Sequence, residues 1–534
     1  MFLNKINNYN TSEFDFYTFL FENDFKAILP ELFLVIAVIL LLVYGVIYST
    51  SSHNKYCLLL NNISMLSLLG LIFTFSLSKE NFITHASIFY NTLVLDDFTY
   101  FLKQLVICSV FFCILISLNY MKKQSFNNFE YIILLLLSVL SMLFLISSAD
   151  FISMYLAIEL QSLCFYVLAA SKRSSEFSTE AGLKYFLLGA FSSGILLFGI
   201  SIIYGFTGIT NFNELAKLFA NSVNDVCEIH NYFFFKGDMN YAGSCLQACE
   251  LGMIFILVGF LFKLTAVPFH MWAPDVYEGA PTSVTAFFSI TPKISFLAIL
   301  IKVFNNSLYD FMVPMQKILI FSSIASMILA CFAAMSQNKI KRLLAFSSIG
   351  HVGYLLIGVC SGTTEGLQAV FIYLVIYIIM TINIFAIILS TLKRDENAVI
   401  VNIPQVKYIS DLTMLAKTNP ILALTFTLTM FSIAGIPPLA GFYSKAYLFF
   451  AAMSSTMYLV AIIGVLTSVI SCFYYIRLIK IMFFEKTRYM LSFNTVKKEN
   501  AIILGITFFF IVFFMLFPTP LYLVSHKFAV AISC

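Results

Sequence analysis

The chain has 534 residues, of which 60% are hydrophobic and 11% are charged, whereas a soluble globular domain carries about a quarter charged residues. This composition excludes an ordinary soluble enzyme and indicates that most of the chain lies in lipid. The net charge of +4 is small for this length, and no cluster of basic residues forms a groove for a polyanion, so no nucleic-acid partner is expected.

Apolar stretches of about twenty residues recur between Leu29 and Leu523, and each is long enough to cross a hydrocarbon core of about 30 Å as an α-helix. Helices are expected because backbone polar groups find no water in that core. The sequence predicts fourteen spans, at residues 29–48, 57–77, 99–119, 130–148, 150–170, 182–205, 250–270, 281–304, 315–336, 341–361, 364–392, 418–452, 456–484 and 500–523.

The hydrophilic segments divide the chain into regions. The longest are Asn211 to Glu250 and Lys393 to Asn419, and within the first, Phe212 to Ala220 could form a short amphipathic helix at the membrane interface. Five regions are predicted: a hydrophilic N-terminal extension (1–28), three N-terminal helices (29–129), a first repeat (130–304), a second repeat (315–484), and a last helix with its tail (500–534). The first repeat contains an insertion around 221–249.

Prolines interrupt two spans that lie five spans apart. Pro268 follows Lys263 in the seventh span, whereas Pro437 and Pro438 precede Lys445 in the twelfth. Broken helices are tolerated at that depth where they line a watery path, and they are common in transporters built from inverted repeats. The offset predicts an all-α polytopic membrane protein of about fourteen helices with two inverted five-helix repeats, spans four to eight and nine to thirteen, in which helices seven and twelve are broken.

Lysine and arginine mark the side of the membrane from which a chain is inserted. The loops after odd-numbered spans carry most of these residues, so the basic loops are expected in the matrix or cytoplasm and both termini on the outer side. The sixty Phe, together with abundant Ile, Asn, Lys and Tyr, indicate AT-rich codons of the kind found in organellar genomes. These features predict a multi-pass protein of the mitochondrial inner membrane with both termini toward the intermembrane space.

Four charged residues fall well inside predicted spans, where a charge costs about 2.5–3.5 kcal/mol. They are Glu159, Lys263, Lys293 and Lys445. Each of them needs a partner, a water-filled cavity or a function. Lys184 is a weaker candidate because it lies near the start of its span, where a lysine can extend to the interface.

Two interpretations of the central charges are possible. A buried salt bridge that merely fixes packing needs matched signs, whereas this set holds one acid and three lysines. Burial disfavours the charged form of a lysine and a nearby carboxylate favours it, so a Glu159 and Lys263 pair that opens and closes would switch the lysine between holding and releasing a proton.

Lys103 and Lys302 lie near span ends and are expected to extend to the interface. His351 is either a helix-packing residue or a proton relay, since imidazole titrates near physiological pH.

The eleven cysteines do not predict a metal site, because paired CxxC spacing is absent. Most lie inside apolar spans and are expected to pack as small hydrophobic residues. The insertion holds Cys227, Cys245 and Cys249 on the predicted outer side. An oxidising compartment permits a disulfide between Cys227 and either of the others, and free thiols are an equally open alternative.

The run FKLTAVPFHMWAPDVYEGAPTSVTAFFSITPKISF, from Phe262 to Phe296, resembles a signature of the antiporter-like subunits of respiratory complex I, the proton-translocating NADH:ubiquinone oxidoreductase. That family is related to the Mrp-type cation/proton antiporters. The portion DVYEGAPTSVTAFFS is similar to the subunit 2 branch of the family, as are ELQSLCFYVLAA, EAGLKYFLLGAFSSG and AGIPPLAGFYSK. The likeness covers roughly Leu29 to Leu523.

The resemblance implies a subunit that moves protons, driven by quinone chemistry in neighbouring subunits, and that has no redox centre of its own. NADH, FMN, iron–sulfur clusters and ubiquinone would belong to partner subunits. The expected partners are a subunit-4-like antiporter subunit, the small membrane subunits and lipids such as cardiolipin. The resemblance places the family's proton-translocating residues at Glu159, Lys184, Lys263, Lys293 and Lys445.

Two other functions compete with this one. A subunit of an Mrp-type sodium/proton antiporter would have no link to NADH, but the motif DVYEGAPTS and the organellar composition argue against it. A membrane scaffold that has lost pumping would have no use for four central charges that are costly to desolvate.

Overall fold

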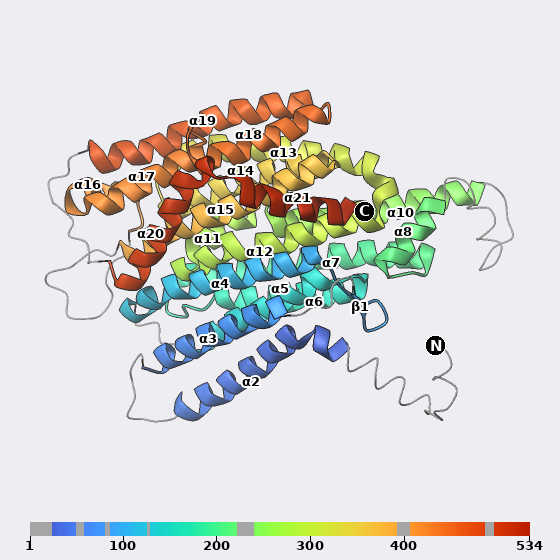
Figure 1. Ribbon diagram of the computed structural model, residues 1–534, viewed down its shortest axis with the longest axis horizontal. Helices are drawn as coiled ribbons and strands as arrows, with labels where there is room; N and C mark the ends of the chain where they lie inside the picture. Colours follow the sequence, from blue (N-terminus) through green and yellow to red (C-terminus); the bar gives the residue numbers. More distant parts are fainter. Residues whose placement is uncertain are drawn as a thin grey trace, which may run out of the picture.

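The computed structural model describes residues 24–49, 58–80, 86–124, 129–221, 240–391, 406–485 and 496–533. Among these residues, thirteen helices are long and apolar enough to cross a membrane (Figure 1), which confirms the predicted all-α polytopic fold. The helices are α2 (Leu29–Ser49), α3 (Leu58–Glu80), α4 (Asp97–Lys123), α5 (Glu130–Ser147), α6 (Phe151–Ala169), α7 (Glu176–Thr207), α8 (Phe212–Asn221), α10 (Asn240–Leu264), α11 (Trp272–Gly279), α12 (Thr282–Lys302), α13 (Met312–Met335), α14 (Ile340–Cys360), α15 (Thr364–Ser390), α16 (Leu415–Thr418), α17 (Pro420–Ala434), α18 (Ala440–Ser454), α19 (Tyr458–Phe483), α20 (Lys498–Phe513) and α21 (Thr519–Ser533).

A short hairpin precedes α4. Strands β1 (Ala86–Ile88) and β2 (Leu93–Leu95) pair antiparallel, with Ala86 opposite Leu95. Further bridges join Leu93 to Ser148 and Asp150 to Asn211. The segments that lead into α4, α6 and α8 therefore meet at one end of the bundle.

Most predicted spans correspond to one helix each, but four differ. The span predicted at residues 250–270 is α10, which begins at Asn240 and ends at Leu264. α7 begins at Glu176, before the predicted start at residue 182. The predicted span at 418–452 consists of two helices, α17 and α18, as its prolines indicated. The prediction for the last span is wrong at its end, because α20 and the 3-10 turn after it stop at Leu516 and the expected tail forms α21. Pro518 separates the two helices, since proline cannot continue the hydrogen-bond ladder.

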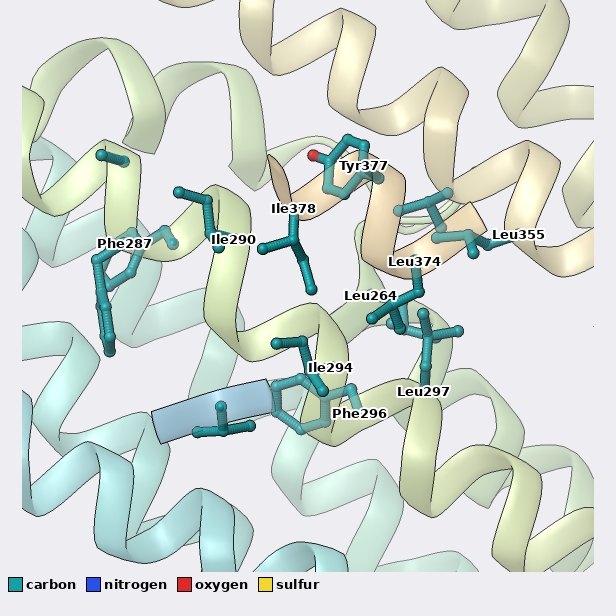
Figure 2. Close-up of a cluster of buried hydrophobic side chains, with 14 of the residues drawn as sticks. Leu264, Phe287, Ile290, Ile294, Phe296, Leu297, Leu355, Leu374, Tyr377 and Ile378 are labelled. Atoms are coloured by element: carbon teal, nitrogen blue, oxygen red, sulfur yellow. The ribbon is translucent and has the colours of Figure 1, made fainter. Parts of the chain in front are cut away.

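α12 lies in the middle of the bundle. Every residue from Thr282 to Lys302 is buried, including the two lysines, so neighbouring segments surround this helix on all sides. α2 and α3 lie along one edge of the bundle and α19 along the opposite edge (Figure 1), and their outward faces expose large apolar residues, as lipid requires. Figure 2 shows α12 packed among its neighbours through Leu264 of α10, Phe287, Ile290, Ile294, Phe296 and Leu297 of α12, Leu355 of α14, and Leu374, Tyr377 and Ile378 of α15.

The two spans that were predicted to be broken, the seventh and the twelfth, are interrupted near their prolines. α10 ends at Leu264, and Thr265 takes a left-handed conformation with φ 67°. α17 ends at Ala434, and Gly435 follows with φ 90°. Each interruption leaves the carbonyl groups of a last helical turn without helical partners, and these groups carry the negative end of the helix dipole.

The two described ends of the chain lie at the same end of the bundle. The Asp24 carboxylate accepts a hydrogen bond from the Phe89 amide (3.2 Å), and Lys527 in α21 forms an ion pair with Asp97 at the start of α4 (2.7 Å). The predicted short helix near residues 212–220 is confirmed as α8.

Candidate functional site

Two of the buried lysines, Lys263 and Lys445, lie close to the ends of half-helices. Lys263 occupies the last turn of α10 and is buried. The close approach of α10 to α7 positions it, because a Cβ on Gly199 would lie only 2.7 Å from the Gly252 carbonyl oxygen. Small residues at such crossings let two membrane helices pack backbone to backbone. The carbonyl end of α10 favours a cation at this position.

Glu159 lies in α6, and α6 packs beside α7, the helix that also packs against α10. One of the Glu159 carboxylate oxygens accepts a hydrogen bond from Ser162 (3.3 Å). The other oxygen and the Lys263 ammonium have no hydrogen-bond partner in the part of the chain that the structure describes. The two groups therefore form no hydrogen bond with each other in the structure, and the switching role predicted for them stays a prediction.

Lys293 lies in the middle of α12, and its hydrogen-bond partners are neutral. Its ammonium donates to the Tyr377 hydroxyl (2.9 Å) and to the Ser348 carbonyl (3.2 Å). Pro292 precedes it and cannot donate to the Phe288 carbonyl as a helical residue would. The Tyr277 hydroxyl donates to that carbonyl instead (3.2 Å), so the proline is accommodated without an unpaired group.

Lys445 in α18 reaches back across the break. It donates to the carbonyl of Ala434 (3.0 Å), the last residue of α17, and its ammonium lies over the Tyr354 ring at 5.2 Å. Although the sequence places Lys263 before its break and Lys445 after its own, both lysines therefore lie at the carbonyl end of the first half-helix. That position favours a cation in both cases.

His351 in α14 lies between two small cavities. The first has a volume of about 20 Å³ and is lined by Ser348 and Tyr377, which are the partners of Lys293. The second has a volume of about 10 Å³ and is lined by Lys445. His351 lines both, and since a water molecule needs about 10–15 Å³ of such space, each cavity has room for about one.

Sequence reasoning missed the tyrosines of this region. The Tyr373 hydroxyl lies 2.6 Å from the Nδ1 atom of His351, and Tyr377 holds Lys293. The two tyrosines are four residues apart in α15 and so share a face. That spacing of polar groups in an apolar span was the available signal.

Lys184 lies elsewhere, in a charged network at the end of the bundle where α14 begins. It forms ion pairs with Glu180 (2.7 Å) and Asp275 (3.2 Å), and 42% of its side chain is exposed. Arg342 in α14 contacts Asp275 (3.5 Å) and Glu278 (3.4 Å). The network joins α7, α11 and α14, so these contacts do not bring Lys184 together with the buried lysines.

The expectation that Lys103 and Lys302 extend to the interface is wrong. Lys103 is buried and forms an ion pair with Glu31 of α2 at 2.6 Å, an acid that sequence reasoning missed. Lys302 is buried and donates to the carbonyls of Ile146 (2.9 Å) and Ser148 (3.2 Å) at the end of α5. In both cases a partner helix supplies the acceptors that water would otherwise provide.

The proposed disulfide falls largely outside the described residues. Cys227 is among the residues not described, and the side chain of Cys245 is not described either. Cys249 is buried in α10. The disulfide therefore stays a prediction.

Residues 148–471 match the transmembrane family described as NADH:quinone oxidoreductase/Mrp antiporter. The chain belongs to this family. The matched range contains Glu159, Lys263, Lys293, His351 and Lys445, together with both broken helices. It excludes the first four membrane helices, α2 to α5, and with them the Glu31 and Lys103 pair.

Relatives resemble the chain over nearly its whole length. It is 55% identical to NADH-ubiquinone oxidoreductase chain 2 of Marchantia polymorpha, over 96% of this chain and 100% of the relative. It is 51% identical to the protein of the same name from Oenothera berteroana, over 96% and 99%. The fold is similar to a chain of respiratory complex I from Thermus thermophilus, with a TM-score of 0.72, 24% identity, and coverage of 92% of this chain and 98% of that one.

Proposed function

We propose that the chain is a proton-translocating membrane-arm subunit of NADH:ubiquinone oxidoreductase and corresponds to chain 2 of its relatives. The observation that carries this proposal is the arrangement of buried titratable groups inside the family fold: Glu159, Lys263 and Lys293 in the first half, and His351 and Lys445 in the second. The relatives named chain 2 support the assignment to this enzyme, since they align over 96% of the chain.

The chemistry required of these groups is reversible proton transfer. Lys263 has no hydrogen-bond partner among the described residues, so a change at Glu159 acts directly on its ability to keep a proton. Lys293 is held by a hydroxyl and a carbonyl, and it can become neutral without leaving a buried carboxylate uncompensated. A water molecule in each small cavity beside His351 would continue the path to Lys445.

Electron transfer belongs to partner subunits in this proposal, and the chain itself carries no redox group. The residues at 130–304 and 315–484 form two inverted repeats, each supplying one half of the path. Lys184 belongs to the entrance, where its network joins α7 and α11 to α14. The neighbours include a subunit-4-like antiporter subunit, the small membrane subunits, and lipids such as cardiolipin.

The membrane is the mitochondrial inner membrane, with both termini toward the intermembrane space. A tag placed before Phe2 should be digested by protease once the outer membrane is opened. A tag that resists digestion until detergent is added would reverse the orientation.

Lys445 provides the test of function. Replacement by Ala removes the proton carrier, whereas Arg keeps a charge that cannot be given up at accessible pH. In the purified complex in vesicles, both variants should lower the number of protons pumped per NADH oxidised. Lys417→Ala in α16 is the control and should pump normally. If Lys445→Arg pumps normally while Lys445→Ala fails, Lys445 is a fixed charge.

Two results would support the competing functions. Normal pumping in Lys293→Ala and Lys445→Ala together would indicate a scaffold. Purification of the chain with sodium-dependent transport activity, and without flavin and iron–sulfur subunits, would indicate an Mrp-type antiporter subunit.

A further inference from the structure

A cavity of about 520 Å³ lies between α5, α6 and α7. It is far larger than the two cavities beside His351 and shares no lining residue with them. Its volume falls within the range of ligand pockets. None of the groups proposed to move protons lines this cavity, so a ligand bound there would be separate from the proton path.

The lining is polar at the helix ends and apolar farther in. Glu130 is the first residue of α5, and Arg173 follows the end of α6. Leu134 lies one turn inside α5, and Phe186 lies ten residues after the start of α7, about 15 Å along its axis. The headgroup layer on each side of a bilayer is only about 5–7 Å thick. The lining therefore changes from polar to apolar in the order in which a phospholipid changes from headgroup to acyl chain.

Several polar groups of the cavity lack partners. Tyr166 is only 7% exposed, yet its hydroxyl and that of Ser171 have no hydrogen-bond partner among the described residues. Both oxygens are covered by protein atoms, and the Tyr166 oxygen lies against Gly189, which does not line the cavity, so the evidence for a ligand comes from the charged residues. Arg173 and Glu130 form no ion pair with each other or with any other residue that the structure describes. One cation and one anion thus flank the cavity without neutralising each other.

We propose that this cavity binds a phospholipid with a primary-amine headgroup, of which phosphatidylethanolamine is the simplest. Arg173 holds the phosphate, and Glu130 accepts from the ammonium. An acyl chain lies along Leu134, Val167 and Phe186. The two phosphates of cardiolipin would meet a single arginine and a carboxylate, and the quaternary amine of phosphatidylcholine cannot donate to Glu130.

Photolabelling tests this proposal on the purified complex that contains the chain. The complex is placed in phosphatidylcholine vesicles with a small fraction of phosphatidylethanolamine that carries a diazirine in its acyl chain, and labelled peptides are identified by mass spectrometry. Labelling is expected within α5, α6 and α7 and should be competed by unlabelled phosphatidylethanolamine. Competition by cardiolipin or phosphatidylcholine should be weaker.

Three variants test the proposed contacts with the phosphate, the acyl chain and the amine one at a time, and a fourth variant is the control. Arg173→Ala should reduce labelling about tenfold, as expected for loss of a charge-assisted hydrogen bond, and Val167→Trp should reduce it by filling the apolar part. Glu130→Gln should abolish the preference for phosphatidylethanolamine over phosphatidylcholine. Leu156→Trp changes the same exposed face of α6 outside the cavity and should leave labelling unchanged.

The opposite results would overturn the proposal. Stronger competition by cardiolipin, or equal competition by phosphatidylcholine, would exclude an amine headgroup. Absence of labelling in the assembled complex would mean that a neighbouring subunit fills the cavity. Labelling per assembled complex that stays unchanged in all three variants would mean that the lipid contacts the general surface and not this cavity.

Discussion

Lys103 of α4 and Glu31 of α2 form an ion pair at 2.6 Å, with 5% and 2% of their side chains exposed. The pair joins the first membrane helix to the third, outside the range that matches the family. Because each ion has left water, the pair stabilises the fold only while both members are present.

Glu31→Gln should therefore destabilise the N-terminal helices by about 3–5 kcal/mol, the usual cost of leaving one buried ion unpaired. The midpoint of thermal dissociation of the purified complex measures this change. The double variant Glu31→Leu with Lys103→Leu should recover most of the loss, because no charge remains to be solvated. Equal loss in the single and double variants would show that the unpaired charge on Lys103 is not the cause of the loss.

Glu159→Gln should leave the complex assembled and sharply lower NADH-driven proton pumping, because the proposed switch with Lys263 loses its carboxylate. The measurement is the number of protons taken up per NADH oxidised in sealed vesicles. Glu176→Gln, at the exposed start of α7, is the matched control. Wild-type pumping in the Glu159 variant would assign that residue a structural role.

Tyr377→Phe removes the hydroxyl that accepts from Lys293 and keeps the ring, 4.8 Å from the ammonium. A hydrogen bond to a charged group contributes about 1.5–3 kcal/mol, so pumping should fall by about tenfold or more while assembly is maintained. Tyr377→Phe should cause no further loss of pumping in a Lys293→Ala background, because the ammonium that donates to the Tyr377 hydroxyl is absent there. An additive loss in the double variant would mean that Tyr377 acts independently of Lys293.

Gly435→Ala should also impair pumping, because the added methyl group would displace Lys445. Gly435 has φ 90°, and a Cβ there would lie 3.1 Å from the Cδ atom of Lys445. A side chain in this left-handed conformation costs about 1–2 kcal/mol, and the contact would push Lys445 away from the Ala434 carbonyl. Gly505→Ala is the control, since no atom lies within 4 Å of its Cβ position. Normal pumping by the Gly435 variant would show that the position of Lys445 tolerates displacement.

The sequence was sufficient for the membrane fold, for the two helix breaks, and for picking out Lys263, Lys293 and Lys445. Each of these depends on properties of a single stretch of about twenty residues: its length, its hydropathy, a proline, or a charge near its centre. The hydropathy of a single stretch does not, however, fix where a helix ends. The last span was placed too far along the chain because Pro518 and α21 compete with a hydropathy that continues smoothly through them.

The tertiary structure decided which charges near helix ends are buried. Lys103, Lys184 and Lys302 look alike in sequence, yet the first meets a buried carboxylate, the second a half-exposed network, and the third two carbonyls of α5. The physical reason is that a lysine side chain is long enough to reach either water or a neighbouring helix, and the choice depends on which helix packs beside it. The cavities that share His351 arise in the same way, because they exist only where side chains of several helices fail to fill the space between them.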